Sequence, residues 1–261
     1  EWSLEDVYQS LLELSDTVGL DDADDYGFTK AKGSDFGFLA DSAYDMVLRA
    51  TNTSDYLFRP TMDGEDGRIW PVEGSLSPLI VEIRSLFDDN GDLSQTRGSG
   101  VLVGPNDVLT AAHVVYASGM ENGWAETISI APGHDQRTNP YGRFEVSEGF
   151  GYPVDTYGGR ISLEQSTYDM ALLHLEEPVG YQYGYMDIGA SLRAGNVIAS
   201  GYPGDAGGTQ INGEGFVSAR EASQLSGGRN YYLYEAKDVS PGSSGGPLWV
   251  FEDDIATVAG N

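Results

Sequence analysis

The sequence predicts an all-β fold over most of its length. From about residue 78 onward, short runs rich in Val, Ile, Leu and Tyr alternate with Gly, Pro, Asn and Asp. Short apolar runs separated by turn residues are typical of a β-sandwich or a β-barrel, whereas alternating βα units would place helical patterns between them. The 35 glycines of the chain also suit a region that is dense in turns.

The expected strands follow one another in the second part of the chain. Each is an apolar run bounded by turn residues. The runs cover residues 78–87, 98–104, 126–132, 169–175, 196–203, 230–236 and 246–251. The Asn-Gly pair within DDNGD, at 88–92, follows the first run and predicts a hairpin turn there.

The first part of the chain has a different character. It is acidic and rich in expected loops, with two helical stretches. Ser3 and Asp6 have the spacing of a helix cap, and apolar residues recur at helical spacing after them. A second helix is expected at 41–50. We therefore divide the chain into an N-terminal extension, residues 1–77, and a β domain, residues 78–261.

Charge and cysteine content exclude several classes of protein. The formal net charge of −27 repels nucleic acids and anionic lipid surfaces, so neither is expected as a partner. The chain has no cysteine, which excludes disulfides and thiolate metal sites. It has no apolar run of about 18 residues, so no membrane-spanning helix is expected.

The segment PGSSGGP, at 241–247, contains two adjacent serines, and either is a candidate nucleophile. A serine hydroxyl needs a base within hydrogen-bond reach, and histidine is the usual one. The chain offers three histidines. His113 follows an apolar run, His134 lies in a polar loop, and His174 alternates with apolar residues, as on the outer face of a strand.

A histidine base is usually oriented by a carboxylate that accepts a hydrogen bond from its second ring nitrogen. Asp169 is a candidate because it starts a strongly apolar run and is therefore expected at the edge of the core. The alternative interpretation is an acidic residue that merely initiates a strand.

Three segments then carry a resemblance to a known family. VLTAAHVV, YDMALLHLEEP and PGSSGGPL occur in that order, and the chain from 78 to 260 resembles the trypsin/chymotrypsin-like serine proteases. GSGVLVGPNDVLTAAHVV, GYPGD and DVSPGSSGGP resemble the bacterial glutamyl endopeptidase-like branch more closely. The resemblance implies two six-stranded antiparallel Greek-key barrels and no required cofactor.

The resemblance also implies roles for individual residues. His113 is expected to be the general base, Asp169 to orient it, and Ser244 to be the nucleophile. The backbone N–H groups of Gly242 and Ser244 are expected to form the oxyanion hole. Ser243 stands where animal trypsins carry an Asp that pairs with a newly formed N-terminus, so that activation switch is missing.

Two further expectations concern the ends of the chain. By the same resemblance, the β domain lacks the last strand and the C-terminal helix of the family. The extension, residues 1–77, is expected to act as a propeptide or regulatory region that inhibits the domain. Cleavage after Arg68 would release it, and N-terminal sequencing of active protein tests that hypothesis.

Asp238 lies six residues before Ser244. Trypsins place the carboxylate of the pocket floor at that offset, so the resemblance favours Arg or Lys at the P1 position of the substrate. The alternative is a structural Asp that caps its own loop.

The acidic loops DDNGD (88–92) and DGEDG (63–67) raise the question of metal binding. Calcium is bound by six to eight oxygen atoms, and such loops supply several. Neither loop has the full EF-hand spacing, so calcium is expected at most as a structural ion, and a hairpin turn is preferred for DDNGD.

The leading hypothesis is an extracellular serine endopeptidase that hydrolyses polypeptides through an acyl-enzyme. A cytoplasmic bacterial protease is the alternative location. The rival hypothesis is a catalytically idle, protease-like binding module that responds to calcium. The complete His-Asp-Ser set argues against this rival, and the expected absence of the last strand argues for it.

Overall fold

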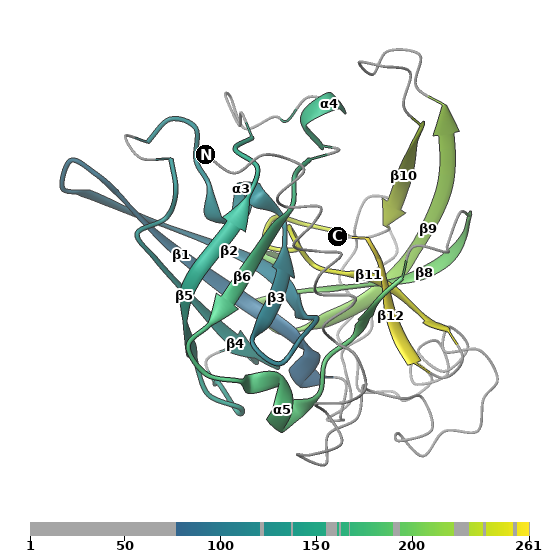
Figure 1. The fold of residues 1–261 in the computed structure, drawn as a ribbon, viewed down its shortest axis with the longest axis horizontal. Coiled ribbons are helices and arrows are strands. Elements are labelled where there is room, and N and C mark those ends of the chain that lie inside the picture. Colours follow the sequence, from purple (N-terminus) through teal and green to yellow (C-terminus); the bar gives the residue numbers. More distant parts are fainter. Residues whose placement is uncertain are drawn as a thin grey trace.

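Two groups of strands make up the part of the chain that the structure describes (Figure 1). The computed structural model describes residues 77–260 apart from 121–122, 137, 155–160, 162, 167, 190–193, 222–229, 237–238 and 253–254. The predictions for the N-terminal extension, its two helices, DGEDG and the Arg68–Ile69 bond lie outside these residues. No helix in the described ranges is long and apolar enough to cross a membrane.

The first group of strands closes into a barrel, drawn in blue and teal in Figure 1. Neighbouring strands in the barrel are antiparallel. In spatial order the strands are β1 (Ile80–Asp89), β2 (Asp92–Leu102), β3 (Asp107–Thr110), β6 (Ala171–Leu175), β5 (Phe144–Gly151) and β4 (Thr127–Pro132). A 3-10 turn, η3 (Ser77–Leu79), leads into β1, and α3 (Ala112–Val115) follows β3.

The turn between β1 and β2 confirms the predicted hairpin. Asn90 and Gly91 both have positive φ, 55° and 94°, as a type I′ turn requires. The Gly91 N–H donates to Asp88 Oδ1 at 2.5 Å. Asn-Gly adopts this turn readily because neither residue is strongly penalised in the left-handed region.

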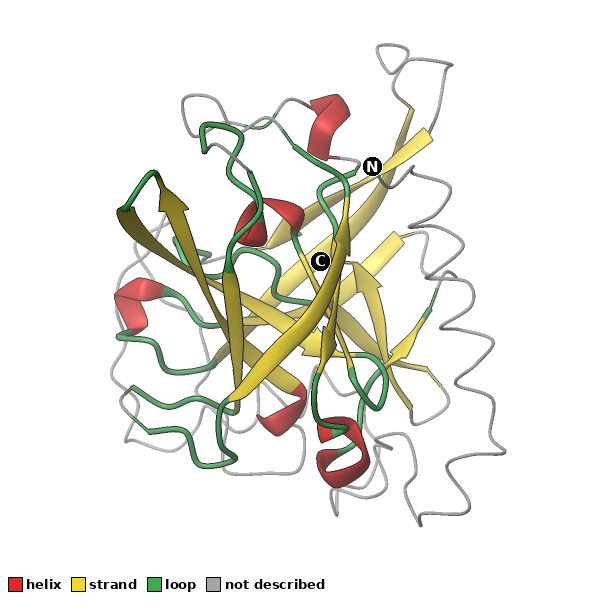
Figure 2. Cartoon of the chain, turned by 60° about the vertical axis from the view of Figure 1, so that its left-hand side comes forward, coloured by secondary structure: helices red, strands yellow, loops and turns green. Residues whose placement is uncertain are grey.

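The second group of strands forms a six-stranded sheet. Its spatial order is β10 (Asn230–Ala236), β9 (Ile211–Glu221), β8 (Ala194–Gly201), β11 (Leu248–Glu252), β12 (Ile255–Gly260) and β7 (Asp187–Ile188). The other helical elements of the described residues are also short: α4 (Leu163–Ser166), α5 (Val179–Tyr183) and η5 (Gly204–Ala206). Figure 2 shows how strongly strands dominate, which confirms the predicted all-β fold.

One detail departs from the prediction of purely antiparallel pairing. Strand β7 pairs with β12 in parallel, through Thr257 opposite Asp187 and Val258 opposite Ile188. This is possible because a long connection separates the two strands in sequence, whereas a tight hairpin allows only antiparallel pairing.

The two largest apolar clusters of the described residues hold the strands together. The inward side chains of the barrel, among them Val81, Ile83 and Leu173, form the first cluster. The second joins the two groups of strands, because Ile80 and Val101 of the barrel share it with Trp249 and Val258 of the sheet. Burying each large apolar side chain contributes about 1.5–3 kcal/mol, so this second cluster fixes the barrel against the sheet.

Candidate active site

The strand register of the barrel brings His113 and Asp169 together. Strands β3 and β6 are antiparallel, and Thr110 lies opposite Ala171. Residues that follow Thr110 therefore emerge beside residues that precede Ala171. His113 lies in α3, the single turn after β3, and Asp169 lies in the loop just before β6.

Asp169 contacts His113 with both carboxylate oxygens. Its Oδ2 lies 2.6 Å from His113 Nδ1, and its Oδ1 accepts the His113 backbone N–H at 2.9 Å. An ionised carboxylate only accepts, so Nδ1 carries the ring proton and Nε2 is left as the basic nitrogen. The Asp169 side chain is 12% exposed, whereas the His113 side chain is 29% exposed. The imidazole is therefore partly open to a substrate, while the carboxylate that orients it is largely covered.

The loop that carries Ser244 lies against the same turn. A Cβ on Gly98 would lie 2.5 Å from Val114 Cγ1 and 3.1 Å from the Ser244 carbonyl oxygen. Gly245 has a φ of 77°, and a Cβ there would lie 2.7 Å from the Ala111 nitrogen and closer still to Thr110 Oγ1. These glycines allow the Ser244 loop to approach the turn that contains His113.

The carbonyl groups around Ser244 are held by hydrogen bonds. The Pro241 carbonyl accepts from Gly204 N–H at 2.8 Å, and the Ser243 carbonyl accepts from Gly246 N–H at 2.9 Å. In a trans peptide the N–H points opposite to the C=O, so fixing a carbonyl aims the N–H of the following residue. These two bonds therefore orient the N–H groups of Gly242 and Ser244.

Neither of these two N–H groups has an acceptor among the residues that the structure describes. Gly242 has a φ of 104°, and a Cβ there would lie 2.5 Å from the Tyr202 carbonyl oxygen, so only glycine fits. Two free backbone donors in one short loop can bind an oxygen atom that gains negative charge if they point to the same side. The sequence predicts these same two N–H groups as the oxyanion hole, and that role stays a prediction.

Two other predictions concern the same loop. Ser243 donates its backbone N–H to the Ser240 carbonyl at 3.0 Å, and no ion pair of a trypsin-type activation switch can form at a serine. Asp238, the predicted residue of the substrate pocket, lies outside the described residues.

The remaining histidines have other partners. His174 lies on β6 and its Nδ1 is 2.8 Å from Asp107 Oδ1, with the imidazole 45% exposed, so the prediction of an outward position holds. His134 was expected in a polar loop, but its side chain is only 2% exposed. Its Nδ1 donates to Asn139 Oδ1 at 2.7 Å, because that amide oxygen can only accept.

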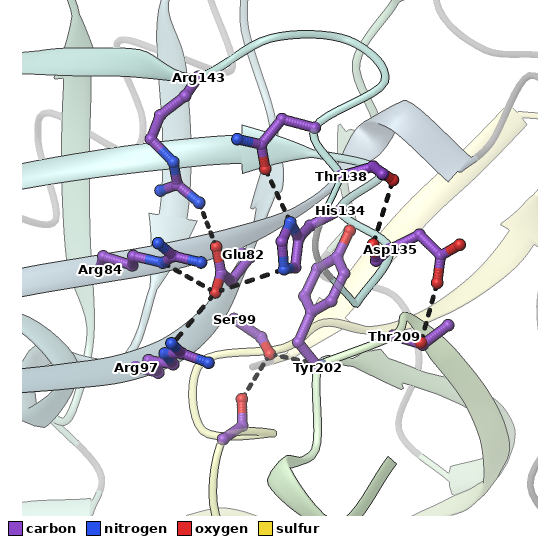
Figure 3. A network of polar contacts seen from close by, with 12 residues as sticks. Glu82, Arg84, Arg97, Ser99, His134, Asp135, Thr138, Arg143, Tyr202 and Thr209 are labelled. Atoms are coloured by element: carbon purple, nitrogen blue, oxygen red, sulfur yellow. Dashed lines mark hydrogen bonds and ion pairs between the residues drawn. The ribbon is translucent and has the colours of Figure 1, made fainter. Parts of the chain in front are cut away.

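His134 belongs to a buried polar network that sequence analysis did not identify (Figure 3). The centre of the network is Glu82, near the start of β1, whose side chain is 2% exposed. Arg84 Nε donates to Glu82 at 3.1 Å, Arg143 donates to its other oxygen, and His134 Nε2 lies 3.8 Å away. A buried carboxylate needs such partners because an unpaired one would lose its hydration without compensation. The charged residue between Val81 and Ile83 was the available signal.

Tyr202 lies beside this network (Figure 3). It follows β8, and its hydroxyl donates to the Ile80 carbonyl at 2.8 Å. Burial raises the pKa of the Tyr202 phenol well above its ordinary value, and nearby Glu82 adds to the effect. The phenol therefore stays neutral and keeps this hydrogen bond near pH 7.

Metal binding finds no support in the part of the chain that the structure covers. That part contains no group of three or more His, Asp or Glu side chains placed to hold a metal ion. The predicted structural calcium therefore stays a prediction, and DGEDG lies outside the described ranges.

Comparison with known proteins identifies the family. A family model described as a trypsin-like peptidase domain matches residues 98–254. The chain belongs to the trypsin-like peptidase family. The matched region runs from the Gly98 of β2 to the end of the β11–β12 connection, and it contains His113, Asp169 and Ser244.

Named relatives place this trypsin-like peptidase near the glutamyl endopeptidases, as the sequence resemblance predicts. The glutamyl endopeptidase of Bacillus licheniformis is 31% identical over 163 residues, which cover 60% of this chain and 47% of the relative. An extracellular metalloprotease of Bacillus subtilis is 34% identical over 118 residues, or 43% of this chain and 35% of that protein. The matches thus span less than half of either relative.

A solved structure supports the same placement. The structure of a Glu endopeptidase in complex with MPD is 25% identical to this trypsin-like peptidase and superposes with a TM-score of 0.53. The match covers 75% of this chain and 85% of that chain. The two-part β architecture is therefore shared over most of both molecules.

Proposed function

We propose that this trypsin-like peptidase is a serine endopeptidase in which His113, Asp169 and Ser244 form the catalytic triad. The observation that carries the proposal is the double contact of Asp169 with His113, at 2.6 Å to the ring and 2.9 Å to the backbone. That contact leaves Nε2 basic, and the family model covers all three residues.

The three residues then have defined roles in acyl transfer. His113 Nε2 takes the proton as Ser244 Oγ attacks the substrate carbonyl carbon, and Asp169 stabilises the imidazolium that results. The N–H groups of Gly242 and Ser244 bind the negatively charged oxygen of the tetrahedral intermediate. His113 next gives its proton to the leaving amine. Water activated by the same imidazole then hydrolyses the acyl-enzyme and restores Ser244.

Labelling with a fluorophosphonate tests this proposal without knowledge of the substrate. The reagent reacts with activated serines, so we expect one label, which peptide mass mapping assigns to Ser244. The Ser243→Ala variant is the matched control and is expected to label at close to the wild-type rate. A wild-type protein that takes up no label, with or without calcium, would favour the binding-module hypothesis instead.

We further propose that glutamate is preferred at P1, in place of the Arg or Lys preference inferred from Asp238. The support is the names of the relatives: a glutamyl endopeptidase at 31% identity and a Glu endopeptidase among the solved structures. A carboxylate at the pocket floor would repel a P1 glutamate, so the two specificities exclude each other.

Internally quenched peptides that differ only at P1 separate these specificities. With Glu, Gln, Arg and Lys at P1, we expect kcat/KM for Glu to exceed that for Arg by at least about 100-fold, because a buried site pairs one sign of charge and rejects the other. Gln is the matched control, since it keeps the shape of Glu without its charge. Faster cleavage after Arg, lost in Asp238→Asn, would overturn the glutamate proposal.

Two other predictions remain proposals. An extracellular location is supported by the Bacillus subtilis relative, which is named an extracellular metalloprotease. Inhibition by the N-terminal extension concerns residues 1–77, of which the structure describes only Ser77.

A further inference from the structure

Ser99 forms two hydrogen bonds to the Ser244 loop, although it has no role in the proposed mechanism. It lies on β2 and is fully buried, between Gly98 and Gly100. Its N–H donates to the Ser244 carbonyl at 2.7 Å, and its hydroxyl donates to the Gly242 carbonyl at 2.7 Å. A single residue of the barrel thus holds the carbonyls on both sides of Ser243.

The Ser99 hydroxyl is itself held in place. Its oxygen accepts the Tyr202 backbone N–H at 2.8 Å, and the dashed lines of Figure 3 show both hydroxyl contacts. The Ser99 carbonyl accepts from Thr110 Oγ1 at 2.7 Å, next to the turn that carries His113. Because the Tyr202 N–H can only donate and the Gly242 carbonyl can only accept, the hydroxyl hydrogen is directed toward Gly242.

The two flanking glycines explain how a strand residue can reach this loop. A Cβ on Gly98 would overlap Val114 and approach the Ser244 carbonyl. A Cβ on Gly100 would lie 2.9 Å from the Leu109 carbonyl oxygen. The Gly-Ser-Gly sequence therefore allows close packing on both sides while the serine supplies the only side chain.

We propose that Ser99 is the positioning residue of the oxyanion hole. The peptide between Gly242 and Ser243 joins the two peptides that present the N–H donors. Its carbonyl is held by the Ser99 hydroxyl, and its N–H is held by the Ser240 carbonyl at 3.0 Å. A glycine with a φ of 104° resists rotation of this peptide only weakly, so an external hydrogen bond must fix it.

This inference rests on the proposed serine endopeptidase function, and its consequence is specific to the transition state. Ser99 is buried and is placed to act through Gly242 and Ser244, so its loss should misplace the donors without removing contacts to substrate. The oxyanion forms only during reaction, which predicts a fall in kcat with little change in KM.

The test compares Ser99→Ala with a control at Ser200. The Ser200 hydroxyl is also buried, donates to Asn212 Oδ1 at 2.5 Å and accepts from Trp249 Nε1 at 2.8 Å. Its replacement by alanine therefore also removes one donated and one accepted hydrogen bond, in this case to side chains. Ser200→Ala is therefore the matched control for stability. Each variant is assayed as the full chain, at a temperature well below its melting midpoint, for fluorophosphonate labelling rate and for kcat and KM.

We expect Ser99→Ala to lower both the labelling rate and kcat by about 10- to 100-fold, less than the loss of a donor itself. KM should stay within about twofold, as should all three values in Ser200→Ala. Ser99→Thr keeps the hydroxyl and should restore most of the rate. If Ser99→Ala does not accumulate as folded protein, Ser99→Cys takes its place, since a thiol of similar shape is a weaker donor.

The outcomes separate this inference from the proposed function. Wild-type protein that resists labelling overturns the proposed function itself. Wild-type protein labelled on Ser244, with Ser99→Ala labelled equally fast, overturns only the role of Ser99. Equal rate losses in Ser99→Ala and Ser200→Ala also overturn it, because the effect would then follow from general loss of packing.

Discussion

Replacing Ser244 with alanine is expected to lower kcat for peptide hydrolysis by about 10⁶-fold, because no acyl-enzyme can form. The loop should keep its conformation, since Ser244 is held through its carbonyl, which accepts from Ser99 N–H at 2.7 Å. The melting temperature should therefore stay within about 2 °C of wild type. Progress curves at high enzyme concentration, together with a thermal melt, measure both quantities.

The neighbouring serine is the control for this prediction. Ser243→Ala removes the same hydroxyl one residue earlier and is expected to retain most activity. Its backbone bonds, from N–H to Ser240 and from carbonyl to Gly246, remain. If Ser243→Ala abolished activity and Ser244→Ala retained it, Ser243 would be the nucleophile and the assigned triad would be wrong.

Replacing Asp169 with asparagine is expected to lower kcat by about 10⁴-fold near neutral pH, the loss known for this change in well-studied triads of this type. The amide can still accept the His113 backbone N–H through Oδ1, so the turn should keep its shape. Its NH₂ group, however, would donate to Nδ1, which then must be unprotonated. The ring proton moves to Nε2, and the imidazole can no longer accept the Ser244 proton.

The second His–Asp pair of the barrel supplies the control. Asp107 Oδ1 lies 2.8 Å from His174 Nδ1, on the outer face of the barrel and outside the assigned triad. Asp107→Asn makes the same chemical change and is expected to leave kcat within about twofold. Steady-state kinetics of both variants measure the difference. An Asp169→Asn enzyme as active as Asp107→Asn would show that Asp169 does not orient the base.

Several features could be predicted from local sequence. Asn90-Gly91 predicts its hairpin because the turn type depends on those two residues alone. His113 and Asp169 could be selected because each stands at the end of an apolar strand, where side chains leave the core. The family resemblance then assigned both residues, together with Ser244, to one His-Asp-Ser set. The family model confirms the resemblance over residues 98–254.

Other features depend on contacts that no local pattern contains. His134 has polar neighbours in sequence, but Glu82 and Tyr202 lie against it, and both come from distant parts of the chain. Glu82 occupies an alternating position that would normally face solvent, yet the three arginines Arg84, Arg97 and Arg143 surround its carboxylate. Periodicity describes one strand, whereas burial here depends on what packs against that strand.

The sequence by itself therefore determined the all-β class, the chemical types of the candidate triad and the absence of disulfides. Only the tertiary structure decided how the two N–H groups of Gly242 and Ser244 are aimed. Their orientation depends on carbonyls held by Gly204, by Gly246 and by Ser99, a residue 143 positions before Gly242. A peptide plane has no preferred direction in a glycine-rich loop until such distant groups fix it, because glycine itself imposes little conformational restriction.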